Sequence, residues 1–93
     1  MASVRIWLDE TSSRLYVRLA GRMENRDFHD LFLRPLRTLG FRFDGAEVAH
    51  FLEFGSPQEC RLIVRQLEAS FEVSRLEKAE IFRWLGLGEG QAY

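Results

Sequence analysis

Side chains that could perform chemistry are few and scattered in this sequence. His29, His50 and Cys60 are its only histidines and its only thiol. A structural zinc site uses about four nitrogen or sulfur ligands at suitable spacing, which three scattered residues do not supply. The sequence contains neither a glycine-rich phosphate loop nor a nucleophile elbow. It therefore predicts a non-catalytic protein with no metal site, no other cofactor and no small-molecule substrate.

Cys60 belongs to the helix around which the rest of the chain is expected to pack. Ser56, Pro57 and Glu59 provide an N-cap, a first helical residue and a capping box. A single apolar stripe follows at helical spacing, formed by Cys60, Ile63, Val64, Leu67 and Phe71. A cysteine in such a stripe usually behaves as a small hydrophobe. The sequence predicts that the remaining elements cover this side of the helix.

Cationic and aromatic residues alternate with aliphatic ones in the first twenty residues. Residues 4–9 and 14–20 both show the period of a half-buried strand, and the polar residues 10–13 are typical of a turn. This pattern predicts an antiparallel hairpin. Its aliphatic side should face the core, so that the opposite side, here called the outer face, carries Arg5, Trp7, Tyr16 and Arg18.

The outer face is the first candidate binding surface. Guanidinium groups bind phosphates and aromatic rings stack on bases, so these residues, extended by Arg42, are candidate contacts to DNA or RNA. Two other interpretations are equally open. The rings can form a cross-strand pair packed inside the protein, or the face can contact a protein partner.

Ile81 and Trp84 are the second candidate surface. The helix predicted from the capping box 74–77 places Leu76, Ala79, Phe82 and Leu85 towards the core. Ile81 and Trp84 then lie beside this stripe. They either widen the core or form an apolar patch that contacts a protein partner or a second copy of the chain.

The remaining elements complete an α+β fold. Asn25 is the expected N-cap of a helix that ends at Gly40 and breaks near residues 33–34, because Pro35 lacks an N–H. Residues 41–43 and about 47–54 predict a second hairpin, with a turn at Asp44–Gly45. Residues 71–73 are either a short fifth strand or a link. The simplest fold is a four-stranded, mainly antiparallel sheet with helices on one face, in the order ββαββαα.

Length and composition set the class of protein. Ninety-three residues with 46% hydrophobic content suit one compact domain, predicted over residues 1–86, with a flexible tail at 87–93. The net charge of −1 favours no class of partner. We expect no signal peptide and no membrane contact, and the single cysteine fits a reducing cytoplasm.

The middle of the chain resembles a known family in its order of elements. This order resembles that of the HARP-type accessory domains of superfamily-2 and annealing helicases. It begins with a helix that contains residues 27–31 and ends at Leu39–Gly40, continues through the turn at Asp44–Gly45, and closes with the capped helix 56–71. The resemblance covers about residues 26–73. Many of those domains carry a tryptophan on the second strand, where this chain has Val48, Phe51 and Leu52. The resemblance implies a DNA-contacting accessory module without chemistry of its own.

Two functions follow from these observations. The first is a nucleic-acid-binding module that uses the outer face. The second is a protein-interaction module, either a homodimer subunit or a small regulator or inhibitor of a larger complex, with Trp7 or Trp84 as its anchor.

Overall fold

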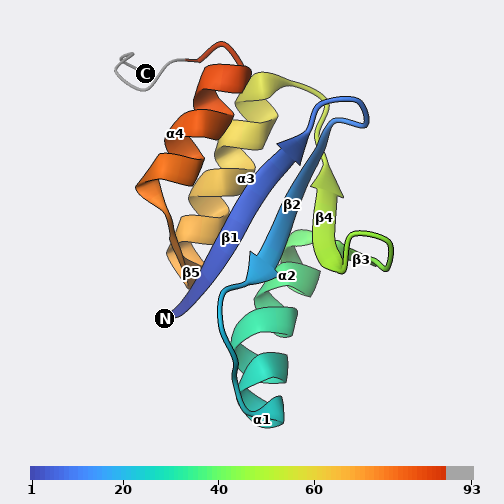
Figure 1. Ribbon diagram of the computed structural model, residues 1–93, viewed down its shortest axis with the longest axis vertical. Coiled ribbons are helices and arrows are strands. Elements are labelled where there is room, and N and C mark those ends of the chain that lie inside the picture. Colours follow the sequence, from blue (N-terminus) through green and yellow to red (C-terminus); the bar gives the residue numbers. More distant parts are fainter. Residues whose placement is uncertain (88–93) are drawn as a thin grey trace.

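A five-stranded mixed sheet forms the centre of the protein (Figure 1). The structure is a computed structural model that describes residues 1–87. The strands lie in the order β3-β4-β2-β1-β5. Neighbouring strands are antiparallel except for β5, which is parallel to β1. The strands are β1 (Ala2–Asp9), β2 (Arg14–Leu19), β3 (Arg42–Asp44), β4 (Ala49–Glu53) and β5 (Phe71–Val73).

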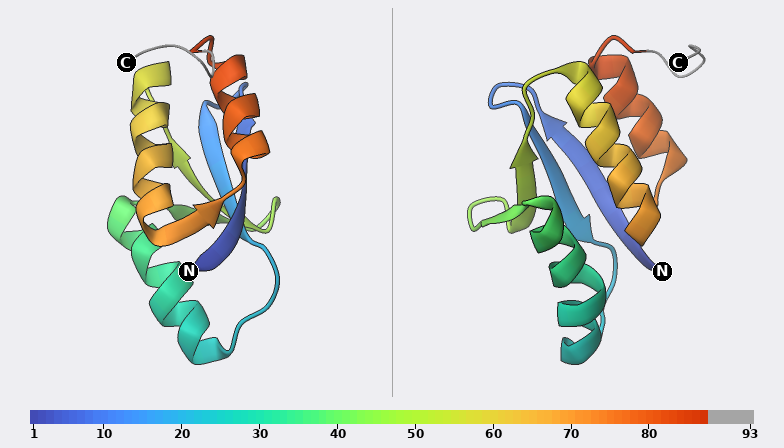
Figure 2. Two further views of the ribbon diagram at one scale, coloured as in Figure 1. Left: turned by 90° about the vertical axis from the view of Figure 1, so that its left-hand side faces the viewer. Right: turned by 180° about the vertical axis from the view of Figure 1, so that it is seen from behind.

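Three helical segments surround the sheet. The first is continuous and consists of α1 (Asn25–Asp27), η1 (Phe28–Leu33) and α2 (Arg34–Leu39); the others are α3 (Pro57–Ser70) and α4 (Arg75–Trp84). Figure 2 shows α2 and α3 on one side of the sheet and α4 beside the edge formed by β1 and β5. None of the helices within residues 1–87 combines the length and the apolar composition that a membrane crossing requires.

The α+β class and the antiparallel arrangement of β1 to β4 were predicted, whereas the four-strand count was wrong; α4 shares the core that α3 covers through Ile81. Residues 71–73 form the parallel strand β5, and the order is ββαββαβα when the first helical segment is counted once. Three residues are too few to reveal a strand by alternation. Pairing with Ala2–Val4 satisfies backbone groups at an edge of β1 that the predicted sheet left open.

The helix containing Pro35 widens where we predicted a break. Residues 28–33 form a π-helical turn, in which the N–H of Arg34 donates to the carbonyl of His29 five residues earlier. This wider turn accommodates a proline that has no N–H to donate and crowds the preceding turn. The predicted cap was also wrong, because Glu24 occupies the N-cap position and its side chain makes no capping hydrogen bond. Gly40 ends the segment with φ of 97°, as expected.

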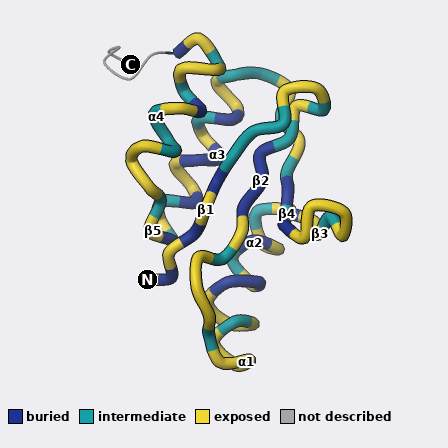
Figure 3. Tube along the Cα trace, viewed as in Figure 1, coloured by how far each residue is buried: buried dark blue, intermediate teal, exposed yellow. Residues whose placement is uncertain are grey.

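The predicted stripe of α3 is the centre of the main core. Cys60, Val64 and Leu67 have no exposed surface, and the Ser56 hydroxyl accepts the Glu59 N–H at 3.1 Å. Burial raises the pKa of the Cys60 thiol to about 12, so it remains a protonated, apolar side chain. Figure 3 shows the buried side of α3 turned towards β1 and β2. The core on this side of the sheet also contains Val4, Ile6, Leu15, Val17, Phe32, Leu36, Phe71 and Ile81.

The second hairpin and the last helix depart from the predicted patterns in detail. The loop between β3 and β4 spans residues 45–48 and is longer than the predicted Asp44–Gly45 turn. In α4, Ile81 is buried while Leu76 is 83% exposed, so α4 is rotated from the predicted orientation. The Leu87 N–H donates to the Phe82 carbonyl at 2.9 Å and its side chain is buried. The rest of the predicted tail, residues 88–93, lies outside the described residues.

Replacing Leu67 by alanine should lower the free energy of unfolding by about 2–5 kcal/mol, because it leaves a cavity in a fully buried site. Leu62→Ala on the exposed side of the same helix should cost less than about 1 kcal/mol. Urea unfolding of both variants measures the difference. Equal losses would contradict the orientation of α3.

The stability should also depend on His50. Its ring packs edge-on against Phe32 and Phe43, and burial, followed by the charge of Arg37, lowers its pKa. The unfolded chain therefore binds more protons around the ordinary histidine pKa of about 6.5, and the free energy of unfolding should fall as the pH is lowered through this value. Chemical unfolding at a series of pH values on both sides of it should show a flatter dependence in His50→Phe.

Candidate functional site

The outer face carries one row of side chains that crosses four strands. Trp7 of β1 pairs with Tyr16 of β2, Tyr16 with Phe51 of β4, and Phe51 with Arg42 of β3. The alternation of the first hairpin thus places the predicted aromatic residues on one face, and the register brings the predicted Arg42 into the same row. Phe51 was not predicted as part of this face, although its parity opposite to His50 and Leu52 was visible in the sequence.

Trp7 and Tyr16 form a stacked cross-strand pair. Their ring centroids lie 5.4 Å apart with an angle of 6° between the planes. Tyr16 is only 3% exposed, and its hydroxyl donates to Asp44 Oδ2 at 2.8 Å. This hydrogen bond lowers the pKa of Asp44 and keeps the carboxylate ionised. Tyr16 is therefore a packed residue of the outer face, whereas Trp7 remains partly exposed.

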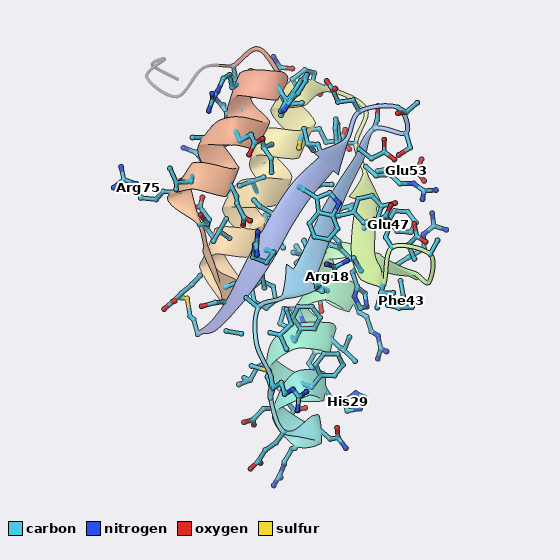
Figure 4. The ribbon with its side chains drawn as sticks, viewed as in Figure 1. Arg18, His29, Phe43, Glu47, Glu53 and Arg75 are labelled. Atoms are coloured by element: carbon cyan, nitrogen blue, oxygen red, sulfur yellow. The ribbon has the colours of Figure 1, made fainter. Side chains whose placement is uncertain are left out.

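Each predicted arginine of the outer face has an acceptor within the protein. Arg5 and Arg18 lie directly opposite each other on β1 and β2, but their guanidinium groups diverge. Arg5 Nε donates to Glu77 at 2.6 Å. Arg18 Nη2 donates to the carbonyl of Glu47 at 2.6 Å, and Figure 4 labels both of these residues. Arg42 pairs with Glu53 at 3.4 Å. The like charges of the face are thus separated and partly neutralised.

Glu77 holds α4 against β1. Its backbone N–H donates to the N-capping hydroxyl of Ser74, while its carboxylate accepts from Arg5 and from the backbone N–H of Ile6 at 3.2 Å. Among residues 1–87, β5 pairs with β1 only at Ala2–Val4. The Glu77 side chain therefore supplies an acceptor to β1 just beyond the end of the β5 ladder.

α4 and the β3–β4 loop border a hollow above Trp7, here called the outer trough. It has a volume of about 460 Å³ and is lined by residues 6–11, Tyr16, Glu47 and residues of α4 within 77–84. This volume falls within the range of small-ligand and side-chain pockets. The trough brings together residues from four separate parts of the sequence.

Trp84 is the most prominent apolar group at this site. It is 61% exposed and borders the outer trough. It also borders a hollow shared with Leu76 and Arg83, and a third beside Leu8 and Phe54. Ile81 is buried in the main core, as the first interpretation of the last helix predicted. The ring of Trp84 is exposed, and its contact with a partner stays a prediction.

The sequence did not indicate the acidic side chains that line the trough. The sequence predicts Glu77 as a capping residue and the carboxylate pairs Asp9–Glu10 and Glu77–Glu80 as ordinary solvated charges, and it assigns no role to Glu47. A single exposed carboxylate has no sequence signal that distinguishes it from an ordinary solvated charge. Only the packing of α4 beside β1 brings these residues together.

Comparison of the chain with models of protein families, with curated proteins and with solved structures finds no match. Within residues 1–87, no group of three or more His, Cys, Asp or Glu side chains is arranged to hold a metal ion.

The loop that carries Glu47 is strained. Val48 has φ of 54°, a conformation that a β-branched residue rarely adopts. The Arg18 guanidinium donates to the carbonyls of both Glu47 and Val48, which holds this conformation over the outer face. Such strain persists only where the surroundings enforce it.

Val48→Asn should raise the free energy of unfolding by about 1 kcal/mol, because asparagine tolerates positive φ. The side chain of Val48 is exposed, so little packing is lost. Val48→Thr keeps the β-branch and should leave the stability near that of the wild type. Thermal or urea unfolding of both variants gives the comparison, and a destabilised Val48→Asn would contradict the strained loop.

Proposed function

We propose that this protein is a non-catalytic protein-interaction module that binds its partner in the outer trough. The observation that carries the proposal is the exposed indole of Trp84 beside the partly exposed indole of Trp7, both lining one hollow. Tryptophan is enriched among residues that dominate binding energy at protein interfaces. The trough provides the concave, partly apolar surface that such anchors require.

The charges of the site favour a protein partner over nucleic acid. Among residues 1–87, five carboxylates line the trough, and no arginine, lysine or histidine does. A phosphate backbone would be repelled there, since nucleic-acid affinity comes largely from neutralised phosphates. The arginines of the outer face already donate to acceptors of the protein. Tyr16 is buried, which removes one of the two predicted stacking rings.

Nucleic-acid binding remains the second candidate because two predicted cations are largely exposed. The side chains of Arg5 and Arg42 are 66% and 71% exposed despite their ion pairs. The resemblance to HARP-type domains also stays a prediction in favour of DNA. Titration of single- and double-stranded oligonucleotides at low salt separates the candidates. Binding that weakens steeply with salt and with Arg42→Ala would favour nucleic acid.

A displayed library of random peptides tests the protein-interaction proposal directly. Peptides enriched on the wild-type protein should bind the Trp84→Ala variant about thirtyfold more weakly, which corresponds to about 2 kcal/mol for an interface tryptophan. Isothermal titration of synthesised peptides measures this ratio.

Leu62→Ala is the matched control, because Leu62 is similarly exposed but lies on α3 and is absent from the lining of the trough. It should bind the selected peptides like the wild type. A library that yields no binding peptide, or peptides that bind Trp84→Ala equally well, would overturn the proposal.

A further inference from the structure

The chemistry of the outer trough specifies the kind of partner more closely. Building on the proposed function, we infer that the trough binds an extended, cationic segment of a partner protein, with an arginine or lysine side chain entering beside Trp7 and Trp84. Three features of the trough support this inference: its charge, its aromatic walls and its position along β1.

The trough carries negative charge that the protein itself does not neutralise. Glu77 is paired with Arg5, but within residues 1–87 no ion pair engages Glu10, Glu47 or Glu80. Asp9 also lines the trough. Polar groups of the following turn, Ser12 and then Thr11, lower the pKa of Asp9, and the Thr11 backbone N–H donates to Asp9 Oδ1 at 3.0 Å. A cationic partner would supply the missing countercharge.

The aromatic walls are suited to the same ligand. The Arg18 guanidinium lies over the Trp7 ring at 4.9 Å from its centroid, so Trp7 already has a cation–π partner within the protein, and the exposed ring of Trp84 is the one open to a cation of the partner. Trp84 presents a second indole, with Glu80 on the same helix also lining the trough. Indole rings combined with carboxylates attract guanidinium and ammonium groups more strongly than either group alone.

The shape of the site favours an extended segment. The trough follows β1 and the turn from Ile6 to Thr11, along the part of the strand that β5 does not pair with. Six residues in extended conformation span about 20 Å. Because Glu77 and α4 already occupy this edge, a peptide of similar length would not pair with β1; it would lie over the trough and place alternate side chains in it.

The test uses two double variants that change the net charge equally. Glu10→Gln with Glu80→Gln neutralises the trough, and Glu24→Gln with Asp27→Asn neutralises two exposed carboxylates at α1, away from it. The probe is a ten-residue peptide of alternating arginine and valine, with glutamate replacing arginine in the control peptide. Fluorescence of the tryptophans measures binding at 50 mM salt, and circular dichroism checks that each variant is folded.

We expect the trough variant to bind the arginine peptide about tenfold more weakly and the α1 variant to bind it like the wild type. Equal weakening in both variants would show a bulk-charge effect and overturn the inference. Equal binding of the glutamate peptide would also overturn it. If the wild-type protein is a dimer that the Trp84→Ala substitution dissociates, the occupant of the trough is a second copy of the chain, and the inference of a cationic segment is overturned.

The inference of a cationic ligand can fail while the proposed protein-interaction function holds, and the library peptides distinguish the two cases. Selected library peptides that need Trp84 but lack arginine and lysine would retain the protein-interaction module and overturn its cationic ligand. Peptides that need Trp84 and are enriched in arginine or lysine would support both.

Discussion

The site depends on the end of one strand ladder. β5 pairs with β1 only as far as Val4, and the next edge N–H, that of Ile6, donates to the carboxylate of Glu77. The same carboxylate accepts from Arg5, and the backbone N–H of Glu77 donates to the Ser74 hydroxyl that caps α4. One side chain thus sets where α4 lies beside the sheet. Because α4 begins there, Glu80 and Trp84 reach the outer trough one and two turns later.

The opposite border of the trough is set by the β3–β4 loop. Arg18 reaches from β2 to two carbonyls of this loop, and Tyr16 reaches from the same strand to Asp44. These contacts hold Glu47 above the outer face and bury the Tyr16 ring. The outer face is therefore a second, smaller packed layer around Tyr16, Ala49 and Phe51, open to solvent mainly near Trp7.

Patterns within single elements were predictable from the sequence, and relations between elements were not. The N-caps at Ser56 and Ser74 and the apolar stripe of α3 follow local rules that the structure confirms. The strand β5 is too short to alternate, and the rotation of α4 is set by packing on the edge of β1. Consequently Trp7 and Trp84 were both predicted as anchors, but their presence in one trough lined with carboxylates was not.

The central claim is that one trough uses both indoles to bind a cationic partner segment. Two-dimensional ¹H–¹⁵N NMR resolves the indole N–H signals of Trp7 and Trp84, the only two tryptophans of the chain. During titration with the arginine–valine peptide, both signals should shift together with the amides of Glu10 and Glu80 and give one dissociation constant. Shifts confined to other surfaces, or two indole signals that do not move, would contradict the account.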